Sequence, residues 1–401
     1  MAKVVVVGGS FAGLTAAFDL RRGLGKEHDV VLISNNPDFV FIPSLPWVVL
    51  GSRSAKDVSF PLAPTLAKQG IEFINEAITK IEPDHNIVHT KDKQINYDYL
   101  VIGTGPSLDF DAIEGLGPHT GYTQSICGLP HALMAQVKFE EFLKNPGPIV
   151  VGVAQGGSCF GAGYEFVLNV DTFLRKHGIR DKVPLTWVTS EPYLGHFGLD
   201  GVGESGKMVQ KIFDDRGIAT YPNHAIAKVE PNNVILDDGT DVPFNFSMII
   251  PAFKGIDAIL QSPGVGNARG FVPINKEMRH PDYHNIFSAG VIVAMAPKSP
   301  TPVPTGVPKT AYMSEHMAKA AARNIIADLN GFPNSEFDPY NMDALCMLDM
   351  GDSGVFISVD PIFPPRRNVS LKYGPWVHAG KIAFEKYFIW KMKNGFTNLP
   401  I

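Results

Sequence analysis

The stretch KVVVVGGSFAGLTAAFDLRRGL, residues 3–24, decides the fold of this chain. It predicts a strand over Lys3–Val7, then a glycine turn and a helix. In such a unit Gly8 allows the tight turn, Gly13 lets helix and strand approach, and the free N–H groups of the helix start face a pyrophosphate. Ser10 stands where a second glycine is usual. The stretch predicts a Rossmann domain with a bound dinucleotide; a Rossmann turn without a ligand is the alternative.

The second expected strand carries an unusual ending for such a domain. Asp29–Ile33 is followed by Ser34 and Asn35, so the acidic residue that usually binds the ribose about 20 residues after the glycines is absent. A hydroxyl or an amide can bond the ribose instead. The position of the first glycine turn, at the very start of the chain, is typical of FAD-dependent enzymes.

A second stretch, VVGVAQGGSCFGAGYEF at residues 150–166, again predicts a strand, a glycine turn and a helix. It lacks the G-x-G-x-x-G pattern and has Cys159 at the mouth of the turn. A thiol near a helix N-terminus has a lowered pKa, because the helix dipole favours the thiolate. The stretch favours sulfur chemistry over pyrophosphate binding, and the alternative is a small apolar thiol buried beneath the turn.

Length and composition narrow the function classes. A chain of 401 residues with 45% hydrophobic content predicts about two globular domains, and the net charge of −5 argues against a nucleic-acid binder. No apolar run of about 18 residues and no charged-then-apolar leader are visible, so we expect neither a spanning helix nor a signal peptide. Three scattered cysteines fit neither a disulfide framework nor a zinc site, so we expect redox chemistry and no metal.

The segment KIAFEKYFIWKMK, Lys381–Lys393, is apolar over most of its predicted helical circumference. Thirteen residues are too few to span a bilayer. The helix is therefore either buried in protein or lies in a membrane interface, with lysines 381, 386, 391 and 393 reaching the headgroups. We favour the interface, which predicts a peripheral or monotopic membrane protein.

The expected fold is α/β, with two tandem Rossmann-like dinucleotide-binding domains and a C-terminal membrane-interface region. The first domain comprises residues 1–109 and 281–330, the second residues 110–280 with Cys127 and Cys159, and the C-terminal region residues 331–401 with Cys346. Strands are expected at 149–153, 184–189 and 285–290, a hairpin at 234–239, and helices at 160–176 and 311–329. The proline-rich stretch 297–308 is expected to be a loop that crosses the cofactor.

Six motifs together give the chain a family resemblance. They are GGSFAGLTAA, LISNN followed by FIPSLPWV, TQSICGLPHA, GGSCFGAGYEF, VPKTAYMSEH and GPWVHAGKIAFEKYF. With these motifs and the spacing of its cysteines, the chain resembles the sulfide:quinone oxidoreductases, monotopic flavoproteins of the two-dinucleotide-domain disulfide reductase superfamily, over almost its whole length. It departs from the superfamily at Val291, where a Gly-Asp pair usually holds the FAD ribityl chain.

The resemblance implies a bound FAD and a redox pair formed by Cys159 and Cys346. Hydrosulfide is a good nucleophile that can open a protein disulfide, which gives a persulfide on one cysteine and a thiolate on the other. Cys127 matches the third family cysteine, which either assists sulfur release or anchors the flavin. The residues expected to hold FAD are Gly8, Ser10, Phe11, Ala12, Gly13, Ser34, Asn35, Thr104, Gly105, Gly290, Lys309 and Thr310.

Four further residues are candidates for charge and proton roles. Glu165 could shuttle protons on the Cys159 helix, although six residues correspond to 240° and the two do not share a face. The resemblance suggests roles for His131 and His196 in sulfide or proton access, and Lys309 begins a helix that would point at the flavin pyrimidine. A solvated or capping Glu165, structural histidines and a surface lysine are the alternatives.

The resemblance also implies a membrane quinone as electron acceptor. Candidate side chains for its pocket come from the C-terminal region and from one N-terminal loop, with core packing as the alternative for each. They are Phe356, Ile357, Phe363, Tyr373, Gly374, Pro375 and Trp376, with Phe41 and Pro43 opposite.

Three other functions compete with this hypothesis. They are an NADH:quinone oxidoreductase of the same fold, a flavin-bearing redox sensor without turnover, and a flavocytochrome-type sulfide dehydrogenase. The quinone type, the length of the sulfur product and the oligomeric state, including a homo-oligomer, stay open at this point.

Overall fold

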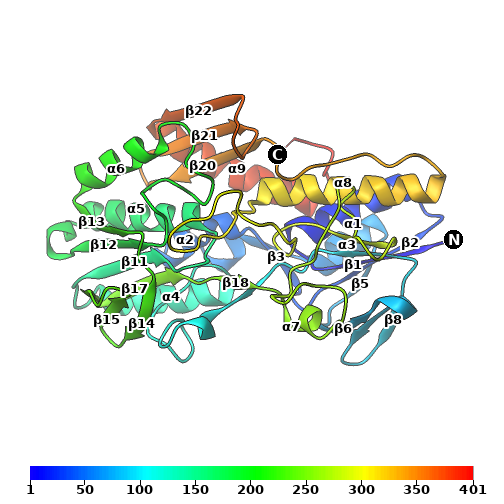
Figure 1. The fold of residues 1–401 in the computed structure, drawn as a ribbon, viewed down its shortest axis with the longest axis horizontal. Coiled ribbons are helices and arrows are strands. Elements are labelled where there is room, and N and C mark those ends of the chain that lie inside the picture. Colours follow the sequence, from blue (N-terminus) through cyan, green and yellow to red (C-terminus); the bar gives the residue numbers. More distant parts are fainter. Residues whose placement is uncertain (401) are drawn as a thin grey trace.

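The first sheet builds a parallel Rossmann core. The computed structural model describes residues 1–400, shown in Figure 1. The strand order of this first sheet is β19-β9-β1-β2-β5, and all of its strands are parallel. The strands are β1 (Lys3–Val7), β2 (Asp29–Ile33), β5 (Glu72–Ile74), β9 (Tyr99–Ile102) and β19 (Ile286–Ser288). The valines of β1 are buried because both faces of the sheet are covered, as parallel sheets require.

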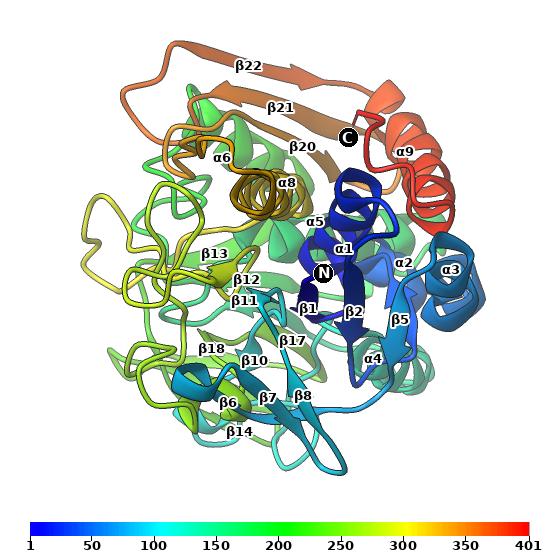
Figure 2. The ribbon, with the colours of Figure 1, turned by 90° about the vertical axis from the view of Figure 1, so that its right-hand side faces the viewer.

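Helices cover one face of this sheet and an antiparallel sheet covers the other. Helices α1 (Phe11–Leu24) and α8 (Ala311–Asn330) pack against each other, as Figure 2 shows in end view. The opposite side carries β6 (Ile78–Glu82), β7 (Ile87–Thr90) and β8 (Gln94–Asn96). Strand β19 comes from far along the chain, so the first domain is assembled from two separate segments.

The second sheet repeats the parallel plan, with the order β13-β12-β11-β17. Its strands are β11 (Ile149–Val153), β12 (Leu185–Thr189), β13 (Ile218–Pro222) and β17 (Phe246–Ile250). The helices around it are α4 (Leu129–Phe142), α5 (Phe160–Lys176) and α6 (Ser205–Arg216), and a small sheet adds β14 (Ile226–Glu230), β15 (Asn233–Leu236) and β16 (Asp241–Pro243).

A third, antiparallel sheet lies across the two Rossmann units. It consists of β20 (Ala344–Asp349), β21 (Gly354–Asp360) and β22 (Asn368–Tyr373), followed by α9 (Pro375–Lys393). Strand β20 packs beside α5 of the second unit, and α9 packs on β20 and β21. The C-terminal region is therefore placed over the helices of both units rather than beside them.

Short elements complete the chain. They are β3 (Asp38–Val40), β4 (Ser59–Pro61), β10 (Ser107–Leu108), β18 (Phe253–Lys254), α2 (Leu45–Val49), α3 (Leu62–Gln69) and α7 (Asp257–Leu260), with 3₁₀ turns at Ile42–Ser44, Ala55–Asp57, Pro83–His85, Phe110–Ala112 and Arg180–Lys182. None of the helices formed by residues 1–400 combines the length and apolar composition that a membrane crossing requires.

The predicted α/β class is confirmed, and apart from the C-terminal helix the predicted elements agree with the structure to within one or two residues. The helix expected at 160–176 is α5 without change, because a glycine turn and the flanking strand mark its start locally. The 234–239 hairpin is confirmed as β15 and β16. The C-terminal helix is longer than predicted and begins at Pro375, whose fixed φ suits a first helical turn.

The expectation for the C-terminal helix was wrong in one respect. Phe388 is fully buried among Phe11, Phe39 and Phe41, so α9 packs on the first domain with one face. Lys381 and Lys391 are also buried and form ion pairs with Glu165 and Glu315, which removes them from any contact with lipid headgroups. A helical projection cannot distinguish a lysine on a membrane from one that neutralises a buried carboxylate.

Candidate active site

The residues expected to hold a dinucleotide meet at one edge of the first sheet. Gly8 follows β1, Ser34 follows β2, Thr104 follows β9 and Gly290 follows β19. Because all four strands are parallel, their carboxyl ends lie together, which is where open α/β sheets bind ligands. The start of α1 points its free N–H groups at the same edge, and Ser10 is exposed there.

The backbone around the first glycine turn forms a cradle that side chains would fill. A Cβ on Gly13 would lie 1.9 Å from the carbonyl oxygen of Gly8, and one on Gly8, whose φ is +109°, would lie 2.2 Å from that of Gly103. The three segments therefore touch through their backbones. This close approach leaves the helix N-terminus open to a large anionic group, so the residues present fit a dinucleotide such as FAD.

Ser34 is less free than the sequence suggests. Its hydroxyl donates to the carbonyl of Asn36 at 3.0 Å and accepts from the Asn36 N–H at 3.1 Å, which closes a local turn. Asn35 is exposed beside it. Of the two candidates for ribose binding, Asn35 therefore has the more accessible side chain.

The second glycine turn is covered by a loop. The N–H of Gly156 donates to the carbonyl of Pro304 at 2.6 Å, and the N–H of Gly306 donates to that of Gly157 at 2.7 Å. The first contact occupies an N–H donor that a pyrophosphate would need, and together the two contacts hold the loop over the turn. The proline-rich stretch expected over the cofactor thus closes the second turn, and this turn is built around Cys159 rather than around a nicotinamide dinucleotide.

All three cysteines are free thiols and partly buried. Cys159 is the N-cap of α5, yet burial raises the pKa of its thiol to about 11, while the Ser158 hydrogen bond and the Lys309 charge lower it only in part. The sequence-based expectation of a lowered pKa was therefore wrong, because desolvation outweighs the Ser158 hydrogen bond and the Lys309 charge. Reduced Cys159 is predominantly protonated at neutral pH.

Cys127 neighbours Cys159, and Cys346 lies on a strand that packs beside α5. Burial and the neighbouring Cys159 thiol raise the pKa of Cys127 far above its usual range. Cys346 lies on β20, which runs beside α5, and burial and the Glu165 carboxylate raise the pKa of its thiol to about 11. The fold thus brings residues of three distant segments to the same helix.

Glu165 is the centre of a buried charge cluster that the sequence did not indicate. Its carboxylate pairs with Lys381 of α9 and accepts the Asp349 N–H at 3.3 Å. Burial raises the pKa of Glu165 to about 7, an effect that Lys381 opposes and Asp349 reinforces. Asp349 in turn contacts Nδ1 of the half-exposed His378 at 2.6 Å. No local pattern marks Asp349, His378 or Lys381 in the sequence, because they join only in the folded chain.

The two candidate histidines lie in different surroundings. Nε2 of His131 is 3.1 Å from Nε2 of His119. Burial lowers the pKa of His131, and the His119 charge lowers it further. His196 is buried, with Nε2 3.4 Å from Asp200, and burial lowers its pKa despite that carboxylate. Within residues 1–400 neither ring forms a hydrogen bond to a cysteine.

Lys309 is a partly buried cation near Cys159, not a freely exposed surface lysine. Its ammonium group donates to the carbonyl of Val293 at 2.9 Å and lies 5.1 Å from the centre of the Phe271 ring. Burial lowers its pKa to about 8, and Cys159 opposes this effect. The next residue, Thr310, caps α8 by accepting the Met313 N–H. The helix start and the cation therefore face the same region as Cys159.

The aromatic candidates for a quinone pocket do not form one cluster. Phe41 is buried against Phe388, and Phe363 is buried against Tyr340, so both are core residues. Trp376 is half-exposed and packs on Phe356 at 5.9 Å between ring centres. For Phe41 and Phe363 the structure therefore favours the core-packing alternative.

Comparison with known proteins identifies the family. The model of the pyridine nucleotide-disulphide oxidoreductases matches residues 2–152. The chain is 45% identical to the sulfide-quinone reductase of Aquifex aeolicus over 98% of its own length and 92% of that protein. The chain belongs to the sulfide:quinone oxidoreductase family. The X-ray structure of the A. aeolicus sulfide:quinone oxidoreductase superposes with a TM-score of 0.94 over the same shares of both chains, at 44% identity.

A related family is more distant. The type II NADH:quinone oxidoreductase of Staphylococcus aureus is 25% identical, over 90% of each chain. The covered turn at Gly156 offers a physical reason for preferring the sulfide:quinone oxidoreductases, since an NADH-dependent enzyme needs an open pyrophosphate site in its second Rossmann unit.

Proposed function

We propose that this enzyme oxidises sulfide through Cys159 and Cys346 and passes the electrons to a quinone. The observations that carry the proposal are that Cys127 neighbours Cys159 at the start of α5, that Cys346 lies on the strand packed beside this helix, and that Lys309 lies near Cys159 beside a closed nicotinamide turn. The name of the A. aeolicus relative supports the substrate pair. The sulfur product and the quinone type are not part of the proposal.

The chemistry starts on the oxidised cysteine pair. Hydrosulfide attacks one sulfur of the Cys159–Cys346 disulfide, so the S–S bond breaks and a persulfide forms on one residue and a thiolate on the other. The persulfide and the thiolate then give up two electrons to the acceptor and rejoin as a bridge that is one sulfur longer, which the next hydrosulfide can open; the chain grows by one sulfur per two-electron oxidation until it leaves. In total each hydrosulfide loses two electrons and one proton, and the quinone gains two electrons and two protons, the second proton coming from solvent. Cys127, adjacent to Cys159, is assigned to the release of sulfur.

The cradle at the first sheet is assigned to FAD. Gly8, Ser10 and Gly13 would hold its pyrophosphate at the start of α1, and Asn35 its ribose. The bound flavin supplies a two-electron acceptor that links the thiols to the quinone. Lys309 and the N-terminus of α8 place positive charge beside the thiols, which stabilises negative charge that develops there.

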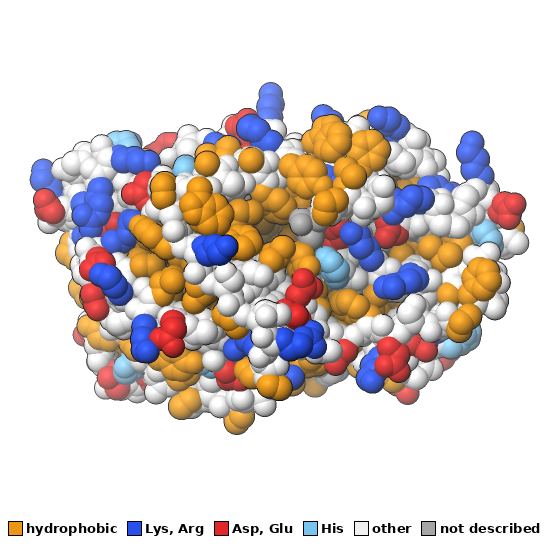
Figure 3. Space-filling view, turned by 90° about the horizontal axis from the view of Figure 1, so that it is seen from above, with side chains coloured by type: hydrophobic (Ala, Val, Ile, Leu, Met, Phe, Trp, Pro, Cys, Tyr) orange, Lys and Arg blue, Asp and Glu red, His pale blue; other side chains and the backbone are white. Residues whose placement is uncertain are grey.

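The membrane contact is assigned to the face that carries α9 and β22. Figure 3 shows hydrophobic side chains gathered around a hollow on this face. Tyr373, Trp376 and Trp390 are 56%, 49% and 50% exposed, and Phe396 lies 5.3 Å from Trp390 between ring centres. Aromatic residues of this kind suit the boundary between headgroups and acyl chains. Lys372, Lys386 and Lys393 remain exposed nearby and can meet anionic lipids.

Anaerobic flavin reduction tests the proposed function. Sulfide should bleach the oxidised flavin of the purified enzyme at least as fast as the enzyme turns over. NADH should leave the flavin oxidised, because Pro304 and Gly306 occupy the second glycine turn. The absorption spectrum before and after each addition is the measurement. Rapid reduction by NADH with no response to sulfide would reverse the assignment in favour of an NADH:quinone oxidoreductase.

Glu165 should give the reaction a pH dependence of its own. Because burial raises the pKa of this carboxyl from 4.5 to about 7, it is protonated at lower pH and cannot accept the proton that leaves the sulfide. The rate should therefore rise through about pH 7. Sulfide ionises in the same range, so the measured quantity is the ratio of quinone reduction rates for wild type and Glu165→Gln at equal total sulfide. A ratio that stays constant between about pH 5 and 9 would exclude this role.

A further inference from the structure

One face of α5 is bonded to the backbone of the turn that follows β20. Residues at spacings of four, three and four lie on the same face of a helix. Here the carboxylate of Glu165 accepts the Asp349 N–H at 3.3 Å, and the other side chains donate to successive carbonyl oxygens. These bonds are Asn169 to Asp349 at 3.0 Å, Thr172 to Met350 at 2.6 Å and Lys176 to Gly351 at 3.0 Å. We call these four side chains the α5 ladder.

The ladder fixes the register between the strand and the helix. Later residues of β20 and its turn bond later residues of α5. Residues earlier in the strand therefore lie toward the start of the helix. Cys346 precedes Asp349 by three residues, about 10 Å of strand. Cys159 precedes Glu165 by six residues, about 9 Å of helix. The two offsets match, which supports placing Cys346 level with Cys159.

A slip of one residue would separate the sulfurs. It would move Cys346 by about 3.3 Å along the strand and turn its side chain to the other face of the sheet. A disulfide bond is only about 2.05 Å long and tolerates little displacement of its Cβ atoms. The geometry of the cysteine pair is therefore sensitive to contacts that lie well away from either sulfur.

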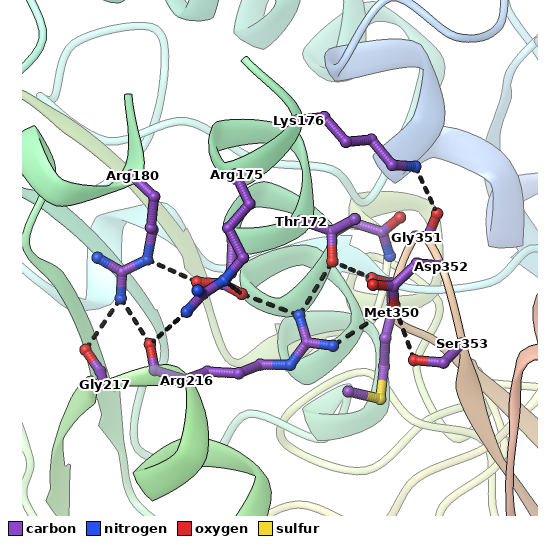
Figure 4. A network of polar contacts seen from close by, with 12 residues as sticks. Thr172, Arg175, Lys176, Arg180, Arg216, Gly217, Met350, Gly351, Asp352 and Ser353 are labelled. Atoms are coloured by element: carbon purple, nitrogen blue, oxygen red, sulfur yellow. Dashed lines mark hydrogen bonds and ion pairs between the residues drawn. The ribbon is translucent and has the colours of Figure 1, made fainter. Parts of the chain in front are cut away.

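The charged residues around the ladder hold it in place. Figure 4 shows Arg175, Arg180 and Arg216 gathered at this end of α5. All three guanidinium groups bond the fully buried Asp171, at 2.8, 2.5 and 2.8 Å. Arg216 also donates to the Thr172 hydroxyl at 3.0 Å and reaches Asp352 at 3.4 Å. The hydroxyl of Thr172 thus accepts from α6 while it donates to the turn.

We propose that Asn169 and Thr172 are positioning residues of the sulfide reaction, which fix the register of β20 on α5 and so hold Cys346 opposite Cys159. The proposal rests on the proposed function, because it assumes that these two cysteines form the redox pair. Neither residue needs to touch sulfide, flavin or quinone. Asn169 also accepts from Nε1 of Trp47, at 3.3 Å, which orients its amide toward the turn.

The test compares Thr172→Val with a matched control. Valine keeps the shape of threonine and removes both the bond to Met350 and the bond from Arg216. Thr65→Val removes the same kind of bond elsewhere, since the buried Thr65 hydroxyl donates to the Pro61 carbonyl at 3.2 Å. Each variant is equilibrated with glutathione buffers, in which one glutathione disulfide is reduced to two thiols as the cysteine pair is oxidised. Alkylation and mass spectrometry then give the ratio of Cys159–Cys346 disulfide to dithiol.

We expect Thr172→Val to lower this ratio about tenfold at fixed glutathione, with a matching loss of sulfide-dependent quinone reduction. Thr172→Ser, which keeps the hydroxyl, should restore both. Thr65→Val should lower the melting temperature without changing the ratio. If Thr172→Val lowers only the melting temperature and the disulfide ratio stays at the wild-type value, the positioning role is wrong.

A second variant and the wild-type enzyme itself provide two further checks of the disulfide ratio. Should Thr172→Val fail to fold, Lys176→Ala removes an exposed member of the ladder and should shift the same ratio in the same direction by about twofold; an unchanged ratio would then overturn the proposal. If wild type itself forms no Cys159–Cys346 disulfide in any buffer, the proposed relay fails first, and the positioning role fails with it. The measurement thus separates the two failures.

Discussion

Replacing Cys346 by alanine should reduce sulfide-dependent quinone reduction by about a thousandfold or more while FAD remains bound. The change removes one end of the cysteine pair, and residues that act as a unit lose nearly the whole activity when either is absent. Cys159→Ala should have an effect of the same size. Because Cys346 lies on β20 and not at the cradle of the first sheet, the flavin content should not change.

Cys127→Ala is the matched control for this prediction. It removes a thiol with comparable burial beside Cys159, but leaves the proposed pair intact, so its effect should be much smaller. Steady-state rates and the flavin absorbance of each purified variant are the measurements. Near-normal turnover by the Cys346 variant would exclude a relay through this pair.

The double substitution Trp376→Ser with Trp390→Ser should release the enzyme from phospholipid vesicles. Each indole is about half exposed and offers on the order of 100 Å² of apolar area, worth roughly 2.5 kcal/mol on transfer to the interface. Together the changes should weaken partitioning by about a hundredfold or more. Sedimentation with vesicles that contain anionic lipid is the measurement, and the reaction of sulfide with the cysteine pair should be unaffected.

A matched pair of substitutions controls for surface polarity. Leu133 and Val137 are 38% and 54% exposed on α4, which lies below α9 in Figure 1, away from the upper face that carries β22. Leu133→Ser with Val137→Ser should leave vesicle binding unchanged. Equal partitioning of the wild type and the tryptophan variant would place the membrane contact elsewhere or remove it altogether.

Truncation is a poorer test of the same contact. An apolar terminal helix suggests that a chain ending before Lys381 would stay folded and leave the membrane. The structure changes that expectation, because the removed segment contains Phe388 of the first core and Lys391, the partner of buried Glu315. Loss of one partner from a buried pair leaves an uncompensated charge, so the truncated chain should unfold or release FAD.

The sequence by itself determined the elements whose signals are local. A glycine turn between a buried strand and a helix marks β1 and α1, and the same pattern marks β11 and α5, with Cys159 at its N-cap. Such signals depend on backbone conformation and on periodicity within about 20 residues. The α/β class and the placement of the cofactor residues after parallel strands followed from them. The cysteine pair came from family resemblance and is still a proposal.

Only the tertiary structure decided which charged groups and thiols are buried, and how β20 lies along α5. Lys381 was expected at a lipid surface but neutralises Glu165, and Cys159 was expected to have a lowered pKa but has a raised one. Both reversals arise from burial, which depends on segments that are up to 216 residues apart in the chain. The turn after β20 is likewise held by side chains of α5 that bond its backbone, which supports the proposed alignment of Cys346 with Cys159. Local patterns carry no information on such contacts, because only the packed chain specifies which groups lose water and what they meet.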